Sequence, residues 1–101
     1  MTEPVAASPD EPPAESHDIR LRRLRMRSWR RGMREMDLLL GPYSDAELAA
    51  LPLGALDDYE RMLSENDQDL YLWLTKGAGA PEAHVPVLRR IAAFHRIAWG
   101  A

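Results

Sequence analysis

Cysteine is absent from this chain, which excludes disulfide bonds, thiolate metal ligands and a cysteine nucleophile. No apolar run approaches the ~18 residues that a membrane-spanning helix needs, so we expect no direct membrane insertion. β-branched residues are sparse and no alternation of apolar and polar residues persists, which argues against strands. The fold class that the sequence predicts is therefore all-α, stabilised by packing alone.

The chain has the length of a single domain, but its ends differ in composition. Residues 1–18 carry five acids, no lysine or arginine, and four prolines. Such a segment cannot bury enough apolar surface to offset its ordering entropy, so we predict a disordered leader. Residues 19–101 are predicted to form one compact helical bundle domain. A transit peptide would be rich in arginine and poor in acids, and no secretory apolar segment is present, so we expect a cytoplasmic (bacterial) protein.

The first half of the predicted bundle is divided by glycine and proline. A first helix should begin after an N-cap at Asp18, and Gly32 should bend the chain after it, because glycine costs about 1 kcal/mol relative to alanine in a helix. A second helix follows, which Gly41-Pro42 should stop or kink. The apolar residues on one stripe of this helix are Met36, Leu39, Leu40 and Tyr43. Ser44 and Glu47 then have the spacing of a capping box, which predicts a further short helix.

Three more helices are predicted in the second half, over residues 54–64, 67–76 and 82–99. The first of them should turn four apolar side chains inward, namely Leu56, Tyr59, Met62 and Leu63. Asn66 is suited to cap the second of them, and Gly77 marks its end. The short connections favour antiparallel neighbours in a compact bundle.

Motifs that would indicate a cofactor, a metal or catalysis are weak. Gly77 and Gly79 lack the preceding strand and third glycine of a dinucleotide fingerprint, so we interpret them as a linker. His84 and His95 would lie about 16 Å apart along one helix, too far to share a metal. Because no nucleophile, base and orienting group occur together, we do not expect an enzyme.

The charge is strongly segregated. Eight arginines and no acids lie within residues 19–34, whereas residues 35–82 are acidic. This basic pole raises the alternative of an adaptor that binds nucleic acid or another acidic partner. The pI near 5.5 and the lack of a helix-turn-helix or aromatic stacking pattern argue against nucleic acid.

The most distinctive segment within this block is Arg31-Gly32-Met-Arg-Glu35. An ion pair between Arg31 and Glu35 at i, i+4 is worth only a few tenths of a kcal/mol, which is too little to explain the cluster. Gly32 lacks a Cβ and lets another backbone approach, arginine grips carboxylates or carbonyls, and Glu35 accepts from donors. We therefore predict a polar docking surface centred on these residues.

The neighbours Trp29, Arg30 and Arg34 are expected to support this surface. The two arginines would add electrostatic steering. The tryptophan would either pack beneath the surface or anchor in a partner, and the sequence does not choose between these roles.

Two longer segments carry a resemblance, namely Arg31-Gly-Met-Arg-Glu-Met-Asp-Leu-Leu-Leu40 and Asp67-Gln-Asp-Leu-Tyr-Leu-Trp73-Leu74. Together they resemble the succinate dehydrogenase assembly factor 2 family, also called the FAD assembly factor family, whose signature is R-G-x-x-E. The likeness extends from about Ile19 to Ile97. It implies a five-helix bundle that binds the flavoprotein subunit of succinate dehydrogenase or fumarate reductase and promotes its covalent FAD attachment.

The resemblance also implies roles for residues and partners. The signature residues are Arg31, Gly32 and Glu35, and they would contact the flavoprotein. Members of the family are not themselves the flavinylating catalyst, so FAD would belong to the partner and no cofactor would be bound stably by this chain. We expect a monomer in the free form and no binding of nucleic acid.

Overall fold

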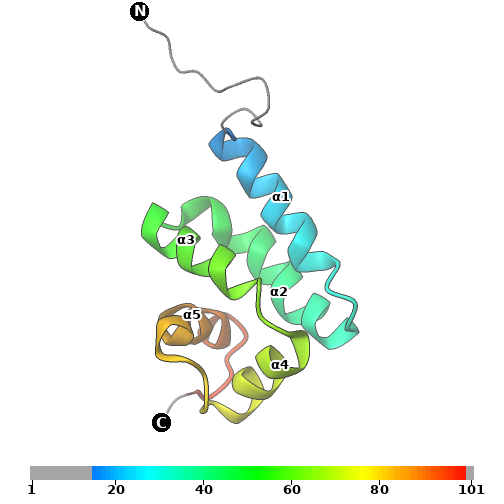
Figure 1. Ribbon diagram of the computed structural model, residues 1–101, viewed down its shortest axis with the longest axis vertical. Coiled ribbons are helices and arrows are strands. Elements are labelled where there is room, and N and C mark those ends of the chain that lie inside the picture. The colour runs from blue at the N-terminus through cyan, green and yellow to red at the C-terminus, as the bar shows by residue number, and fades with distance from the viewer. Residues whose placement is uncertain (1–14, 100–101) are drawn as a thin grey trace, which may run out of the picture.

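The computed structural model describes residues 15–99, which form five α-helices and two short 3₁₀-helices (Figure 1). No strand occurs within this range, so the predicted all-α class and the five helices are confirmed. The elements are α1 (His17–Trp29), α2 (Arg34–Glu47), η1 (Leu48–Ala50), α3 (Leu53–Met62), α4 (Asp67–Lys76), η2 (Glu82–His84) and α5 (Val85–Phe94).

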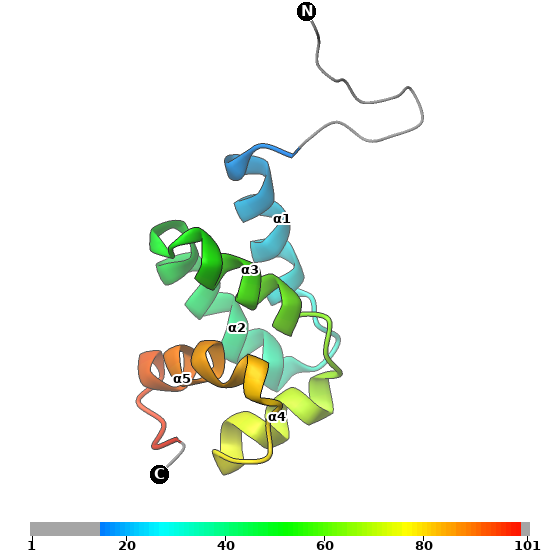
Figure 2. The same ribbon diagram turned by 60° about the vertical axis from the view of Figure 1, so that its left-hand side comes forward.

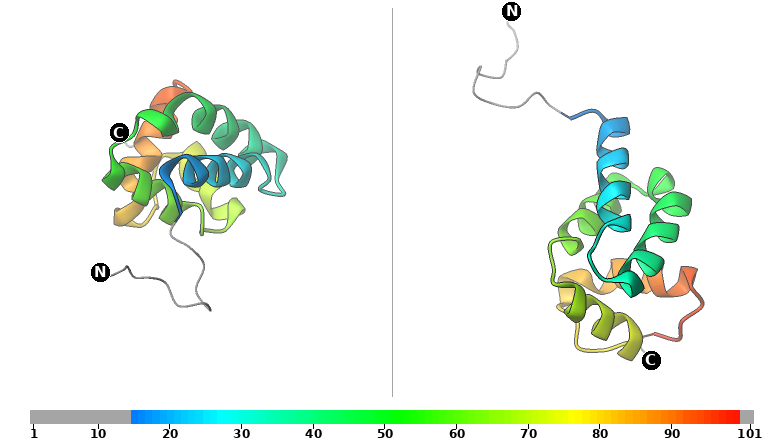
Figure 3. Two further views of the ribbon diagram at one scale, coloured as in Figure 1. Left: turned by 90° about the horizontal axis from the view of Figure 1, so that it is seen from above. Right: turned by 90° about the vertical axis from the view of Figure 1, so that its right-hand side faces the viewer.

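Helices α1 and α2 form a hairpin joined by residues 30–33, which we call the α1–α2 turn. Viewed from above, the two helices run side by side (Figure 3). The N-terminal end of α1 projects beyond the other helices, whereas α4 and α5 lie toward the opposite end of the molecule (Figures 1 and 2). One face of α1 is therefore left without a neighbouring helix.

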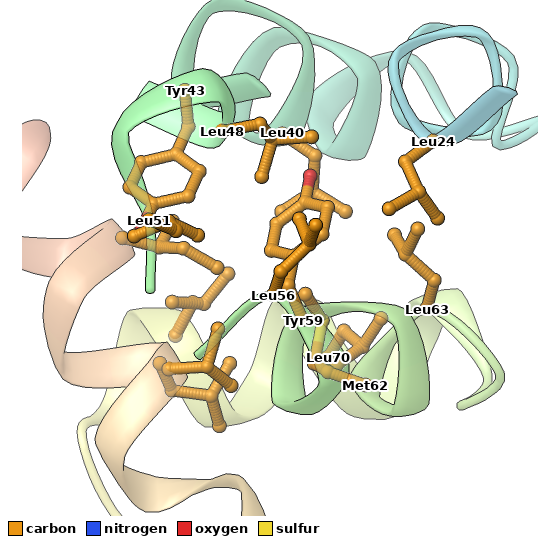
Figure 4. Packing of buried hydrophobic residues seen from close by; sticks show 14 of the residues in the cluster. Leu24, Leu40, Tyr43, Leu48, Leu51, Leu56, Tyr59, Met62, Leu63 and Leu70 are labelled. Atoms are coloured by element: carbon orange, nitrogen blue, oxygen red, sulfur yellow. The ribbon is translucent and has the colours of Figure 1, made fainter. Parts of the chain in front are cut away.

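The hydrophobic core lies between the α1–α2 pair and the other three α-helices, and all five α-helices contribute to it (Figure 4). Tyr43 of α2 and Tyr59 of α3 stack at its centre with 5.7 Å between ring centroids. Apolar spacing of three and four residues placed these side chains on inward faces, as the sequence predicted. The buried apolar side chains of α1 and α2 are Leu21, Leu24, Met36, Leu40 and Tyr43.

A buried polar contact joins α1 to α3 within this core. Ser28 Oγ donates to the Leu24 carbonyl at 2.8 Å and lies 2.6 Å from the hydroxyl of Tyr59. Because the serine proton is already donated, the tyrosine hydroxyl donates to Ser28. Burial raises the pKa of Tyr59, so it remains a neutral donor.

Helix α1 begins earlier than expected. Ser16 is its N-cap, with Oγ accepting from the Ile19 N–H at 3.1 Å, and Asp18 lies inside the first turn. The predicted N-cap at Asp18 was therefore wrong by two positions, since a serine and an aspartate so close together both fit a cap. The last four residues of the predicted leader belong to this ordered start, and its residues 1–14 lie outside the described residues.

Helix α2 does not stop at Gly41-Pro42, which was one of the two predicted outcomes, because it continues through Pro42 to Glu47. The capping box was wrong for the same reason: Ser44 is buried inside the helix and donates to the Gly41 carbonyl at 2.7 Å. The predicted short helix is reduced to η1. Burial of one continuous apolar face along α2 outweighs the local cost of proline.

In the second half, the ends of α4 are confirmed: Asn66 Oδ1 accepts from Gln68 N–H at 2.8 Å, and Gly77 ends the helix at φ 71°. Helix α5 is shorter than predicted. It ends at Phe94 because Arg96 adopts φ 59°, a left-handed cap that the sequence does not mark with glycine.

Candidate partner-binding surface at the turn between α1 and α2

Gly32 sets the shape of the α1–α2 turn. Its φ of 91° lies in the left-handed region, which glycine adopts without strain. A Cβ at this position would meet no atom within 4 Å, so the space above Gly32 is open. The predicted bend is confirmed, and the backbone conformation supplies a reason for glycine that the sequence alone did not.

Arg31 points inward and binds the distant linker between α3 and α4. Its Nε donates to Asp67 Oδ1 at 2.6 Å, and its two Nη atoms donate to the carbonyls of Leu63 and Glu65 at 2.6 and 2.9 Å. Only 9% of its side chain is exposed. The ion pair with Glu35 that the spacing allowed is absent from the contacts within residues 15–99. The Arg31 side chain instead connects the α1–α2 turn to the linker and the start of α4.

A second hydrogen bond fixes the backbone of the same residue. The Arg31 N–H donates to Asp37 Oδ1 at 2.7 Å, so a side chain from the first turn of α2 holds the preceding turn. Sequence reasoning missed both Asp37 and Asp67 as residues that bind Arg31. The sequence did indicate that Asp37 and Asp67 each lie in the first turn of a predicted helix, but it did not indicate that they bind Arg31.

The linker that receives Arg31 is held from its other side by His84. The His84 ring lies with Nε2 at 2.7 Å from Glu65 Oε2, and the imidazole is buried. His84 was expected only to be unsuited to a metal site, and the structure gives it a place in the packing between η2 and the linker. The α1–α2 turn thus rests on a linker that is anchored twice.

Trp29 packs on α2, which is one of the two roles that the sequence left open. A Cβ at Gly41 would overlap the indole ring, so the ring lies directly against the α2 backbone. The indole Nε1 donates to Asp45 Oδ2 at 3.1 Å. With 40% of its surface exposed, Trp29 forms one flank of the turn, and its contact with a partner stays a prediction.

The remaining predicted site residues lie on the surface around the turn. Gly32, Glu35, Arg30 and Arg34 are all exposed, and the side chains of Glu35, Arg30 and Arg34 make no hydrogen bond or ion pair within residues 15–99. Leu38, one turn after Glu35 on α2, is also 52% exposed. The structure therefore brings an open backbone, one carboxylate, two guanidinium groups and an apolar side chain together.

The positive charge of the basic pole, residues 19–34, is partly neutralised by acids of the same chain. Arg20 binds Asp57 at 2.7 Å and Glu60 at 2.9 Å, and Arg23 binds Glu60 at 2.8 Å. With Arg31, three of the eight arginines are therefore engaged in ion pairs with other residues of the described range 15–99. This leaves less charge for nucleic-acid phosphates than the sequence suggested.

Other kinds of site find little support between residues 15 and 99. No group of three His, Cys, Asp or Glu side chains in this range is arranged to hold a metal ion. None of the helices described there has the length and apolar character to cross a membrane. A hollow of about 700 Å³ lies between residues 76–80 and Trp99, but it is lined by none of the predicted site residues.

Fold and surface together define a class: a small all-α protein with a polar patch on a turn between two helices that is held by hydrogen bonds to Arg31. A protein-family model described as "Flavinator of succinate dehydrogenase" matches residues 22–95. The chain belongs to this family. Its matched region includes the whole α1–α2 turn and the linker that Arg31 binds.

Several curated relatives are named succinate dehydrogenase assembly factor 2, mitochondrial. The protein of Lodderomyces elongisporus is 39% identical over 69 residues, which cover 68% of this chain and 42% of the relative. The Aspergillus terreus protein is 44% identical over 64 residues, covering 63% and 21%. The Schizosaccharomyces pombe protein is 35% identical over 68 residues, covering 67% and 49%. The aligned part of this chain thus spans less than half the length of these relatives.

No solved structure matches the chain. The relatives correct one expectation from the sequence, because they are mitochondrial proteins of fungi and contradict the prediction of a bacterial cytoplasmic protein. That prediction came from the charge of the first 18 residues, a segment outside the family match.

Proposed function

We propose that this chain binds the flavoprotein subunit of succinate dehydrogenase, or of fumarate reductase, and promotes the covalent attachment of FAD to it. Membership of a family described as a flavinator of succinate dehydrogenase supports this function. The names of the relatives support it as well, since they describe assembly factors of the same enzyme.

The observation that carries the proposal is the open, rigid turn around Gly32. Its positive φ exposes backbone without a side chain, and Arg31 holds this backbone against the linker below. A surface that is already ordered loses less conformational entropy when a partner binds. Glu35, with Arg30 and Arg34, then supplies the charges that orient the partner.

In this proposal the chain supplies binding and the partner supplies chemistry. FAD stays in the flavoprotein, this chain binds no cofactor stably, and it is not the catalyst of the covalent step. A binding protein shifts the flavoprotein toward the conformer that it binds more tightly, by no more than its difference in affinity. We expect the free chain to be a monomer, which sedimentation velocity can test.

The direct test is to place a long side chain at Gly32. We expect Gly32→Arg to lower covalent flavin on the co-expressed flavoprotein, measured as fluorescence of the denatured subunit. Gly54→Arg is the matched control, because Gly54 of α3 is also exposed with open space around it but has no positive φ. This control should leave flavinylation unchanged.

A second variant separates loss of binding from loss of folding. Glu35→Gln keeps the size of an exposed helical side chain, so its circular dichroism should match that of the parent chain while flavinylation falls. Glu82→Gln, on the exposed surface of η2, is its control. Unchanged covalent flavin with both Gly32→Arg and Glu35→Gln would contradict the proposal. Tighter nucleic-acid binding by Gly32→Arg would favour the adaptor alternative.

A further inference from the structure

The outer face of α1 combines apolar side chains with arginines. Ile19 and Met26 are 53% and 49% exposed, although both are large and apolar. A shallow hollow of about 360 Å³ lies between them on the helix. It is lined by Ile19, Arg22, Arg23, Met26 and Arg27, which we call the α1 outer face.

This face has positive charge that the described residues do not neutralise. Arg22 and Arg27 form no ion pair within residues 15–99. Of the three arginines on this face, only Arg23, at the edge facing α3, is paired with acids of the part of the chain that the structure describes. A segment that covers this face should therefore be acidic, and it should bring small apolar groups for the hollow.

One acid next to α1 already lies against this face. Glu15, directly before the N-cap, receives two hydrogen bonds from Arg23, at 2.7 Å from Nε and 2.8 Å from Nη2. These bonds lower the pKa of Glu15, which stays a carboxylate. The chain that precedes Glu15 therefore starts from the edge of the α1 outer face.

We propose that residues 1–14 of this chain dock on the α1 outer face. The segment contains Glu3, Asp10 and Glu11 but no lysine or arginine, so its charge complements the face. Its apolar residues are mainly small or cyclic, including Pro4, Val5, Pro9, Pro12 and Pro13. Proline rings cover apolar surface with little loss of backbone freedom, because their φ is already fixed.

The length of the segment fits this contact. A proline-rich chain extends by roughly 3.1 Å per residue, so Asp10 lies within roughly 15 Å of Glu15. Ile19 and Met26 are seven residues apart, or about 10 Å along the helix. Measured from Glu15, Arg22 lies about 10 Å and Arg27 about 18 Å along the helix. Asp10 and Glu11 therefore reach the level of Arg22, and the long side chain of Arg27 can span the remaining few Å. The contact is superficial and electrostatic, and it needs no core of its own.

The docked segment would cover arginines that an acidic partner surface would otherwise meet. Because the segment is tethered next to its site, its effective concentration is high even when its intrinsic affinity is low. A partner that binds the same face must displace it. This inference concerns the chain alone and does not depend on the proposed function.

The absence of cysteine permits a direct test on the full-length chain. A nitroxide label on Ala6→Cys should broaden the backbone amide signals of Arg22 and Met26 at low ionic strength. The amide of Leu72, exposed on α4, serves as the internal reference and should keep its intensity. Salt at about 1 M shortens the screening length to about 3 Å and should remove the broadening.

Charge variants decide whether the contact is specific. Asp10→Asn with Glu11→Gln should abolish the broadening, whereas Glu82→Gln, which removes an acid elsewhere, should leave it in place. Broadening that survives both the double variant and high salt would overturn the proposal, as would equal broadening at Leu72. Broadening seen only between labelled and unlabelled copies in a mixed sample would show docking on a second molecule and would also overturn it.

Discussion

Arg31 and Asp67 lie 36 positions apart in the chain, yet the Nε of one donates to the Oδ1 of the other at 2.6 Å. This contact joins the α1–α2 turn to the N-terminus of α4. The same guanidinium binds two carbonyls of the preceding linker, so three bonds depend on one side chain. The shape of the candidate surface is therefore determined by residues from the other half of the sequence.

Removing the Arg31 side chain should destabilise the fold. We expect Arg31→Ala to lower the free energy of unfolding by about 3 kcal/mol, because it leaves the poorly exposed Asp67 carboxylate and two carbonyls without their donor. Arg31→Lys should recover only part of the loss, since an ammonium group does not reproduce the guanidinium fork. Urea denaturation measures both. Arg30→Ala, at the exposed neighbour, should change stability by less than about 0.5 kcal/mol. Similar losses of unfolding free energy for Arg31→Ala and Arg30→Ala would contradict a specific stabilising role of the Arg31 contacts.

Two exposed glycines should respond to alanine with opposite signs. Gly32→Ala should destabilise the chain by about 1 kcal/mol, because φ of 91° is strained for any residue with a Cβ. Gly54→Ala should stabilise it by about 0.5 kcal/mol, since Gly54 lies in α3 with open space around it. Thermal melts of both variants test the pair. A stabilising Gly32→Ala would show that the turn does not need a left-handed residue.

The packing of Trp29 on α2 predicts coupling between two positions. Gly41→Ala should destabilise by about 1–3 kcal/mol despite the higher helix propensity of alanine, because the new Cβ overlaps the indole ring. Trp29→Ala alone should also destabilise. In the double variant the overlap is gone, so the loss should be smaller than the sum of the two single losses. Additive losses would show that the residues do not touch.

The ion pairs between α1 and α3 predict a pH dependence of stability. Partial burial tends to raise the pKa of Glu60, but hydrogen bonds from Arg23 and Arg20 outweigh it and lower that pKa below its ordinary value of 4.5. The stability that Glu60 contributes is therefore fully present above pH 4.5 and is lost as pH falls through the lower native pKa. Urea midpoints of the parent chain and Glu60→Gln should differ near neutral pH and converge in acid. A difference that stays constant into acid would contradict this assignment.

Local patterns were sufficient for much of the fold. Apolar spacing identified the buried face of α2, including Met36, Leu40 and Tyr43, and Asn66 and Gly77 marked the ends of α4. These features depend on residues within one or two turns of each other. The same rules also drew attention to Gly32 and its neighbours, because charge and glycine cluster there in the sequence.

Local rules were wrong where packing outweighed them. Pro42 lies within α2 because the helix buries its apolar face on both sides of the proline. At the neighbouring Leu39 carbonyl, the His95 ring from the end of α5 makes a hydrogen bond of 2.6 Å. Such a bond between residues 56 positions apart leaves no trace in the local sequence.

By itself the sequence determined the all-α class, the inward faces of the helices and the position of the turn at Gly32. These follow from backbone preference and from the period of the helix, which act over a few residues. Only the tertiary structure decided which charges stay exposed. Arg31 and Arg30 are adjacent and chemically equal, but one binds Asp67 inside the fold and the other faces solvent. That difference arises from the position of α4, because a buried guanidinium is stable only where acceptors already converge.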